Sequence, residues 1–199
     1  DRNVGGVMVY ALNKGAAAGL SRLIASGSFK KKYTAVVTGK PLPEEGSLTD
    51  YLTADRRRNY VSVSESGAAG AKKAVLRYKT IEEYAFLLPR SEADPAAYAY
   101  PVPSNSLTGL YLLEIELQTG RQHQIRVQTA NAGFGILGDL KYNKERTEEI
   151  FGPQARGLRP YLFASELSFC HPAELPKNHH DNVLCICQLQ LFQGLAVPT

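Results

Sequence analysis

Residues 109–131, GLYLLEIELQTGRQHQIRVQTAN, contain the change of pattern on which the fold assignment depends. Apolar and polar residues alternate over Gly109–Gln118, which predicts a strand with one buried face. After Thr119-Gly120 the spacing becomes helical, which predicts a helix over Arg121–Asn131 that Gly133 closes. The first-turn amide N–H groups of such a helix are unpaired, so a positive helix end is expected directly after the strand.

The N-terminal part of the chain is predicted to contain a strand, a helix and a second strand. Val4–Leu12 is apolar and β-branched, as in a buried strand. Lys14–Ser26 carries apolar residues at helical spacing, and Gly27 follows as a candidate C-cap. Lys32–Thr38 alternates like a strand. Leu42–Tyr51 contains proline, glycine and serine, which indicates a loop.

The rest of the chain is richer in strands than in helices. Further strands are predicted at Lys73–Tyr84, Phe163–Phe169 and Val183–Leu191. Leu88–Leu107 shows no periodicity, and strand patterns resume on both sides of it, so we expect an inserted loop at about 88–107. Because strands and helices do not alternate one for one, we expect an α+β fold with a mostly antiparallel sheet.

Composition and length indicate a single globular domain. The chain has 199 residues, of which 44% are hydrophobic and 21% charged, and its formal net charge is +4. No apolar run approaches the roughly 18 residues of a membrane span, and no charged-then-apolar leader opens the chain. Three cysteines are too few for a disulfide scaffold. We therefore expect a cytoplasmic protein that does not enter a membrane.

Positive charge is concentrated in short clusters. Lys30–Lys32, Arg56–Arg58 and Lys72–Lys73 are runs of consecutive basic residues. Such clusters neutralise phosphates and attract polyanions. They are equally typical of a solvated surface whose acidic residues lie elsewhere, so charge alone leaves both interpretations open.

Arg126 is a candidate for a buried functional cation. It stands between Ile125 and Val127, so its guanidinium is expected next to apolar surface. A partly buried arginine needs a carboxylate or an anionic ligand as its partner. A local carboxylate such as Asp139 is one partner, and an anionic ligand is the other. His123 lies three residues earlier, on the same face of the predicted helix.

Tyr33 and Asp1 have less distinctive surroundings in the sequence. A half-buried tyrosine in a strand usually packs its ring and satisfies its hydroxyl locally. The functional interpretation is a ring on which an unstacked base lies. Asp1 has no preceding residues in this sequence, and a terminal aspartate is usually solvated.

Two further patterns are weaker candidates for a site. The residue types of a zinc site recur near the C-terminus, at His171, His179, His180, Cys185 and Cys187. A Cys-x-Cys pair on a strand puts both sulfur atoms on one face, which is more typical of a packed core, so no metal is expected. GKPLPEEG at 39–46 lacks the Gly-Lys-Ser/Thr of a phosphate-binding loop, so nucleotide hydrolysis is not expected.

Three segments of the chain together resemble the RluA-type family of RNA pseudouridine synthases. The family's Thr-Gly-Arg-x-His-Gln-Ile-Arg motif is matched without a gap by Thr119–Arg126. Its Lys-x-Tyr-x-Ala strand is similar to Lys31–Ala35, with a closing glycine at Gly39. The first motif, which ends in a catalytic aspartate, corresponds to Asp1 followed by Arg2–Val7.

Two downstream stretches extend the resemblance. Ile136–Asp139 and Tyr142 are similar to the family's loop after the third motif. Leu162–Ala164 and Phe169–Pro172 are similar to its closing strand. All these segments occur in the family's order and span roughly residues 1–172.

The resemblance implies a pseudouridine synthase fold and an isomerase that needs no cofactor. Such an enzyme breaks the C1′–N1 bond of a specific uridine in ribosomal or transfer RNA and rejoins the base through C5. By resemblance, Asp1 is the catalytic carboxylate, which attacks the nucleoside or takes a proton from it. Arg126 would pair with Asp1 and keep it ionised. Tyr33 would stack on the flipped-out uracil and take part in acid–base chemistry.

The resemblance also implies RNA as the partner and a monomeric enzyme. RNA-contacting side chains are expected at Arg2, Lys31, Lys32, Arg121, His123 and Gln124.

The chain departs from the family pattern at several positions. Val4-Gly5 replaces Thr-Ser, Phe134-Gly135 replaces a frequent His-Pro, and Phe163 replaces the histidine of Leu-His-Ala. The family's His-Arg-Leu before the catalytic aspartate, and the strands before it, are missing from the sequence. We therefore expect residues 1–199 to form a single catalytic domain truncated at its N-terminus.

These departures leave a second hypothesis. The chain would then be a catalytically silent RNA-binding paralogue or an inactive fragment of such an enzyme. A carboxylate on a flexible chain end is not held in its productive position, and catalysis depends strongly on that position. The presence of His-Arg-Leu upstream of Asp1 in the natural gene would favour the enzyme.

Overall fold

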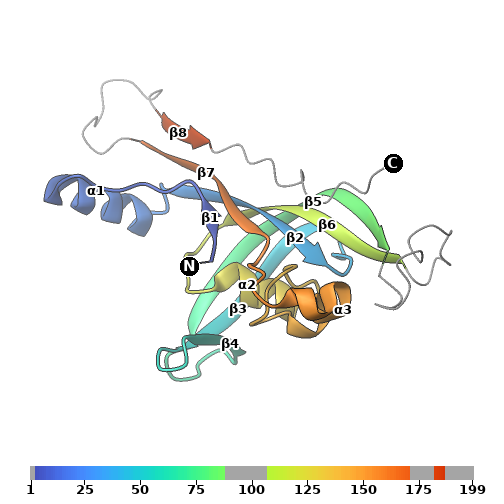
Figure 1. Cartoon of the computed structure of the whole chain (residues 1–199). Coiled ribbons are helices and arrows are strands. Elements are labelled where there is room, and N and C mark those ends of the chain that lie inside the picture. The colour runs from blue at the N-terminus through green and yellow to red at the C-terminus, as the bar shows by residue number, and fades with distance from the viewer. Residues whose placement is uncertain (1–2, 88–106, 171–181, 187–199) are drawn as a thin grey trace.

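The computed structural model describes residues 3–87, 107–170 and 182–186 and shows one mixed sheet with helices packed beside it (Figure 1). The strands are β1 Gly5–Gly6, β2 Lys30–Thr38, β3 Glu45–Asp55, β4 Tyr60–Ser64, β5 Lys72–Leu87, β6 Leu107–Leu117, β7 Leu162–Cys170 and β8 Asn182–Ile186. The helices are α1 Lys14–Ala25, α2 Gln124–Asn131 and α3 Lys144–Phe151, followed by a 3-10 turn at Gly152–Ala155.

The strand order is β1-β7-β2-β6-β5-β3-β4, with β8 paired to the other part of β7. Within the described ranges the β1–β7 pair is parallel and all other strand pairs are antiparallel. Figure 1 shows a strongly twisted sheet, with α2 and α3 below it and α1 at its left end. The predicted α+β class with a mostly antiparallel mixed sheet is therefore confirmed.

Most of the predicted elements are present. The helix predicted over Lys14–Ser26 is α1, where the amide N–H of Ala16 donates to the Asn13 side chain at 2.9 Å. Gly27 follows it with a φ of +75°, as a C-terminal glycine should. The strands predicted in the middle of the chain correspond to β2, β5, β6 and β7.

Three predicted segments differ from the structure. The strand predicted over Val4–Leu12 is reduced to Gly5–Gly6, because only these residues pair with β7. The loop predicted at Leu42–Tyr51 is wrong beyond Glu44, since β3 begins at Glu45 and pairs with β5. The helix predicted from Arg121 begins three residues later, at Gln124.

Two other predictions fall largely outside the described residues. The inserted loop at 88–107 does so except for Leu107, which belongs to β6. The last predicted strand, Val183–Leu191, can be followed only to Ile186.

The largest buried cluster lies between β2, β6 and α2. Ala35, Leu113 and Ile115 project from the sheet and are fully buried. Ile125 of α2 packs against them, and the half-buried Tyr33 lies at the edge of the same cluster. The buried face of α2 thus fixes the helix against the strand that carries Tyr33.

A ring of backbone hydrogen bonds joins β2 to the two loops that follow α2 and α3. Val36 donates to the carbonyl of Tyr161, Tyr161 donates to Leu137, and Leu137 donates back to Val36, each at 2.9 Å. The loop containing Asp139 is therefore held beside β2. Among the described residues, no helix is long and apolar enough to cross a membrane.

Candidate active site

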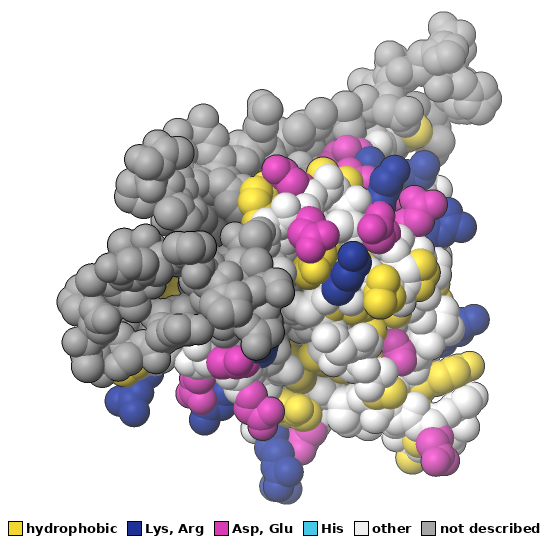
Figure 2. All heavy atoms as spheres, turned by 90° about the vertical axis from the view of Figure 1, so that its right-hand side faces the viewer, with side chains coloured by type: hydrophobic (Ala, Val, Ile, Leu, Met, Phe, Trp, Pro, Cys, Tyr) yellow, Lys and Arg dark blue, Asp and Glu magenta, His cyan; other side chains and the backbone are white. Residues whose placement is uncertain are grey.

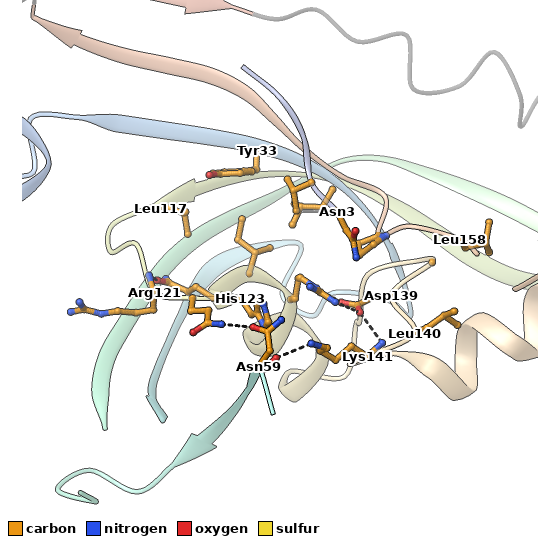
Figure 3. Close-up of a pocket in the computed structure, with 18 of the residues that line it drawn as sticks. Asn3, Tyr33, Asn59, Leu117, Arg121, His123, Asp139, Leu140, Lys141 and Leu158 are labelled. Carbon is orange, nitrogen blue, oxygen red and sulfur yellow. Dashed lines mark hydrogen bonds and ion pairs between the residues drawn. The ribbon is translucent and has the colours of Figure 1, made fainter. Parts of the chain in front are cut away.

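A pocket of about 1240 Å³ opens between β2, the N-terminus of α2 and the two loops after the helices (Figure 3). Its lining includes Tyr33 from the sheet, and Arg121, His123 and Arg126 from the turn and helix of the 119–131 stretch. In Figure 3 the Tyr33 ring lies on the sheet side, with Asn59 on the opposite wall. The structure therefore brings together side chains that are far apart in the sequence.

Arg126 and Asp139 form a buried, two-bond ion pair on the pocket wall. The Nε–H and an Nη2–H of Arg126 donate to the two carboxylate oxygens of Asp139, each at 2.7 Å. Arg126 is 5% exposed and Asp139 is 0% exposed. The Asp139 carboxylate also accepts the backbone N–H groups of Lys141 at 3.0 Å and Tyr142 at 3.3 Å. The local carboxylate that the sequence offered as a partner of Arg126 is thus one of its partners.

The Tyr142 ring completes the setting of this guanidinium. The Cζ atom of Arg126 lies 5.1 Å from the ring centroid of Tyr142. A cation over an aromatic face is stabilised by the ring's negative face. One side of the Arg126 side chain is therefore covered by an aromatic ring, while its end is bonded to Asp139.

His123 is held in an unusual backbone conformation at the start of α2. Its φ is +50°, and its Nδ1 lies 2.7 Å from the hydroxyl of Tyr142. The same hydroxyl accepts the backbone N–H of Val61 at 3.0 Å, so its own hydrogen is available to donate to Nδ1. Burial, followed by the charges of Arg126 and Lys141, lowers the pKa of His123 to about 4. His123 is therefore a neutral group at pH 7.

Tyr33 gives the pocket an aromatic wall. Tyr33 is half-buried, and the apolar side chains of Leu117 and Leu162 line the same pocket. Burial raises the pKa of the Tyr33 phenol, so the hydroxyl stays protonated at neutral pH. A planar, partly accessible ring beside apolar side chains is suited to stacking with a base.

Gln124 holds the strand-to-helix turn in place. Its Oε1 accepts the hydroxyl of Thr119 at 2.8 Å and the backbone N–H of Arg121 at 2.9 Å, and its Nε2 donates to the carbonyl of Val75 at 3.0 Å. Gln124 is buried, and Arg121 is exposed. The turn delays the start of α2 and carries Arg121 and His123 along the pocket wall.

The remaining predicted contact residues lie elsewhere or outside the described part of the chain. Lys31 and Lys32 are not among the pocket-lining residues. The Lys31 ammonium lies 5.4 Å from the Phe29 ring, and burial lowers its pKa. Lys32 lies 3.7 Å from Glu114 across the sheet. Asp1 and Arg2 fall outside the described residues. So do the side chains of the cysteines and histidines considered above as a zinc site, His171, His179, His180, Cys185 and Cys187.

Several polar pocket residues were not singled out from the sequence as site candidates, among them Asn3, Asn59 and Lys141. Asn59 and Lys141 line the wall opposite Tyr33, and Asn3 lines the N-terminal side. Asn59 follows the arginine run and has a φ of +49°, a conformation that asparagine adopts more readily than most residues. A turn at Asn59 could have been predicted from its residue type. The position of this turn beside the pocket, however, depends on the pairing of β3 with β4. Within the described ranges, no group of three or more candidate metal-binding side chains is present.

Comparisons with known proteins agree on one family. The model of the RNA pseudouridylate synthase family matches residues 1–131. Among curated proteins, tRNA pseudouridine synthase C of Vibrio parahaemolyticus is 30% identical over 172 residues, which are 86% of this chain and 64% of the relative. Ribosomal large subunit pseudouridine synthase D of Zymomonas mobilis is 28% identical over 176 residues, or 86% of this chain and 47% of the relative.

Solved structures show the same fold. Human RNA pseudouridylate synthase domain containing 4 superposes with a TM-score of 0.61 at 20% identity, covering 92% of this chain and 66% of that one. Human RNA pseudouridylate synthase domain containing 1 gives 0.60 at 21% identity, covering 89% and 62%. The chain thus spans about half to two thirds of the length of the proteins it matches.

Proposed function

The chain belongs to the RNA pseudouridylate synthase family, and we propose that it converts uridine to pseudouridine in transfer or ribosomal RNA. The observation that carries this proposal is the pocket itself, whose lining includes both a buried arginine ion pair and the aromatic side chain of Tyr33. Relatives with names of both tRNA and ribosomal enzymes match the chain, so both RNA classes are candidate substrates. A resident metal or cofactor is not needed for this isomerisation.

The catalytic carboxylate in this proposal is Asp1. It lies two residues before Asn3, which lines the pocket. Two peptide units span about 7 Å at most, so the chain connection allows the carboxylate to reach the reacting nucleoside. The carboxylate would assist cleavage of the C1′–N1 bond, either by attack on the nucleoside or by accepting a proton from it.

Arg126 is proposed to hold that carboxylate ionised and oriented. A guanidinium presents a fork of N–H donors, and Asp139 accepts two of them. Asp139 therefore fixes the plane of the Arg126 side chain, and Asp1 is proposed as a second carboxylate partner of this guanidinium. A cation next to a carboxylate lowers its pKa and favours the charged form.

Tyr33 is proposed to hold the detached uracil and to accept the C5 proton. When the new C1′–C5 bond forms, C5 carries one hydrogen too many, and that hydrogen leaves as a proton. N1, which has lost its bond to C1′, takes up a proton in return, so the product is an isomer of the substrate. A ring on the pocket wall keeps the base close to the sugar while it turns.

The size of the pocket suits an unstacked nucleotide with part of its backbone. Pockets for single small ligands are typically about 300–1,000 Å³, and this one is about 1240 Å³. A base inside a helix cannot reach such a pocket, so the target uridine has to leave its stack.

The proposal is tested by tritium release from cellular RNA labelled at C5 of uridine. We expect release by the wild type, and loss of release in Asp1→Asn and in Arg126→Lys. Binding of the same RNA is measured in parallel by filter retention. RNA binding without any release by the wild type would overturn the proposed activity and favour the RNA-binding paralogue.

A further inference from the structure

The turn between β3 and β4 presents three arginines to solvent. Arg56, Arg57 and Arg58 are exposed. The Asp55 side chain orders the turn, because it accepts the backbone N–H groups of Arg57 at 2.9 Å and Arg58 at 3.1 Å. The Asp55 Oδ2 atom also lies 3.8 Å from Nε of Arg58, and this ion pair is largely exposed. One carboxylate thus stands against three positive charges.

Asn59, the last residue of this turn, ties the arginines to the active-site pocket. Its side-chain oxygen accepts an Nε2–H of Gln122 at 2.7 Å, and its carbonyl accepts the Lys141 ammonium at 2.8 Å. All three residues line the pocket. The arginine turn is therefore continuous with the pocket wall that faces Tyr33 (Figure 3).

The strand after the turn is fixed to the same wall. The Tyr60 ring packs on the Tyr142 ring with centroids 5.0 Å apart. The backbone N–H of Val61 donates to the Tyr142 hydroxyl, which also contacts His123. Because these contacts run from β4 into the pocket, the position of the arginines relative to the pocket is set by packing.

Further cations continue the positive surface around the pocket mouth. Arg121 and Lys141 line the pocket and are exposed. The Nε–H of Arg121 donates to the carbonyl of Lys73, whose exposed side chain belongs to β5 beside β3. On the face shown in Figure 2, by contrast, basic and acidic side chains are intermixed. The coloured part of that face therefore does not share the clustering of basic side chains found at the pocket mouth.

We propose that the turn Arg56–Arg58 binds the phosphates of the RNA strand that flanks the uridine in the pocket. This inference rests on the proposed function, since it assigns the surface that receives the rest of the substrate. Guanidinium groups match phosphate oxygens in shape and charge. Contacts of this kind position the strand and carry no base specificity. Carboxylates of an acidic protein segment would also pair with guanidinium groups, and such a partner is the alternative outcome of the test.

The test compares two triple variants in the salt dependence of RNA binding. The first is Arg56→Gln/Arg57→Gln/Arg58→Gln. The matched control is Lys14→Gln/Lys40→Gln/Lys79→Gln, which removes the same charge from exposed positions outside the pocket lining. Lys79 pairs with Glu45 at the far end of β3, roughly 30 Å of strand from the arginine turn.

Binding of a short fluorescein-labelled RNA hairpin with uridines in its loop is followed by anisotropy over a range of salt concentrations. Each phosphate contact to single-stranded RNA contributes about 0.7 to the slope of log K against log salt. We expect the arginine variant to lose about 2 from this slope, and the control variant to lose less than about 0.7. Equal slopes in both variants overturn the proposal, and so does a slope unchanged from the wild type.

Two further measurements separate this inference from the proposed activity. Circular dichroism confirms that the variants fold, which is expected because the Asp55 bonds are to backbone groups. Tritium release by the wild type tests the proposed synthase activity without reference to the arginine turn. If release occurs and the arginine variant keeps the wild-type slope, the inference alone is wrong, and a partner other than RNA is assigned to the turn.

Discussion

The Asp139 carboxylate binds the Arg126 guanidinium through two parallel hydrogen bonds of 2.7 Å, with both side chains almost completely buried. A pair of this kind is costly to bury, and its two bonds fix the plane of the guanidinium. Asp139 is therefore a positioning residue in the proposed enzyme. Its oxygens also hold the backbone of the following loop, so the pocket wall and the cation are set together.

Asp139→Asn should lower both stability and tritium release. Removing one charge of a buried pair leaves the other uncompensated, and such changes typically cost about 3–5 kcal/mol. The free energy of unfolding is measured by urea denaturation. Release should fall further than the population of folded protein explains, because Arg126 loses its two-bond support.

The matched control is an exposed pair on α3. Glu148→Gln removes the partner of Lys144, whose ammonium lies 3.7 Å away. Exposed pairs are worth less than about 1 kcal/mol, so the control should unfold close to the wild type. If Asp139→Asn and Glu148→Gln had the same stability, the buried pair would not have the structural importance argued for it.

Strands β3 and β4 and helix α3 were not predicted from the sequence, and β3 shows where local pattern stops being informative. The residues after Pro43 include Gly46 and Ser47, which indicate a loop. In the structure this stretch begins β3, because it pairs residue by residue with β5, from Glu45 opposite Lys79 to Leu52 opposite Lys72. The hydrogen bonds to a neighbouring strand stabilise β3, and they cannot be predicted from the residue propensities of β3 itself. The 109–118 strand was predictable because its alternation is complete.

The site was predictable to a similar degree. Tyr33 and Arg126 follow from the motif resemblance, and the pocket lining includes both. Asp139 appeared in the sequence as one of two kinds of partner for Arg126, and spacing alone could not choose between them. The bond between His123 and Tyr142 was not predicted, since it depends on a left-handed residue at the start of α2.

His123 should make the folded protein sensitive to mild acid. Its pKa is about 4 in the folded state, against an ordinary value of 6.5. Between these values the unfolded chain binds a proton that the folded chain does not, so stability is lost as the pH falls from about 6.5 to 4. His123→Asn keeps an acceptor for the Tyr142 hydroxyl and tolerates the positive φ, but it cannot titrate.

The measurement is the thermal unfolding midpoint of both proteins from pH 7.5 to pH 4. The wild type should lose stability relative to His123→Asn as the pH falls below about 6.5. All other titrating groups are shared by the two proteins, so the difference between the curves isolates His123. Parallel curves would show that its pKa is not lowered in the folded state.

Gly138 should not tolerate alanine. Its φ is +78°, and a Cβ there would lie 2.3 Å from the backbone oxygen of Arg159. Gly67 also has a positive φ, +95°, but no atom lies within 4 Å of its would-be Cβ. Both substitutions carry the cost of a positive φ, about 1–2 kcal/mol. Gly138→Ala should lower the free energy of unfolding by about 1–3 kcal/mol more, because the added methyl group overpacks the loop.

Urea denaturation of the two glycine variants measures this difference directly. Gly138 precedes Asp139, so displacement of its backbone should also reduce tritium release. Gly67→Ala should retain release at the wild-type rate, because it lies outside the pocket lining. Similar stability losses in the two variants would mean that the loop moves away from Arg159 without cost.

Tyr33→Phe tests whether the hydroxyl takes part in proton transfer. The phenol pKa is raised by burial, so the phenolate that could accept the C5 proton is a minor species at pH 7. As long as the pH is below the pKa, the phenolate fraction grows about tenfold with each unit by which the pH rises. Single-turnover tritium release by the wild type should therefore rise between pH 7 and pH 9. The phenylalanine variant should be slower by about 10²–10⁴ and show no such rise.

Tyr78→Phe is the matched control, since burial also raises the Tyr78 pKa but its hydroxyl donates to the Pro43 carbonyl, outside the pocket lining. It should keep the wild-type rate and pH profile. Anisotropy with the RNA hairpin should show that Tyr33→Phe still binds, because phenylalanine preserves the stacking surface. A Tyr33→Phe enzyme with the wild-type rate would reduce Tyr33 to a stacking platform. The C5 proton would then have to pass to another acceptor in the pocket.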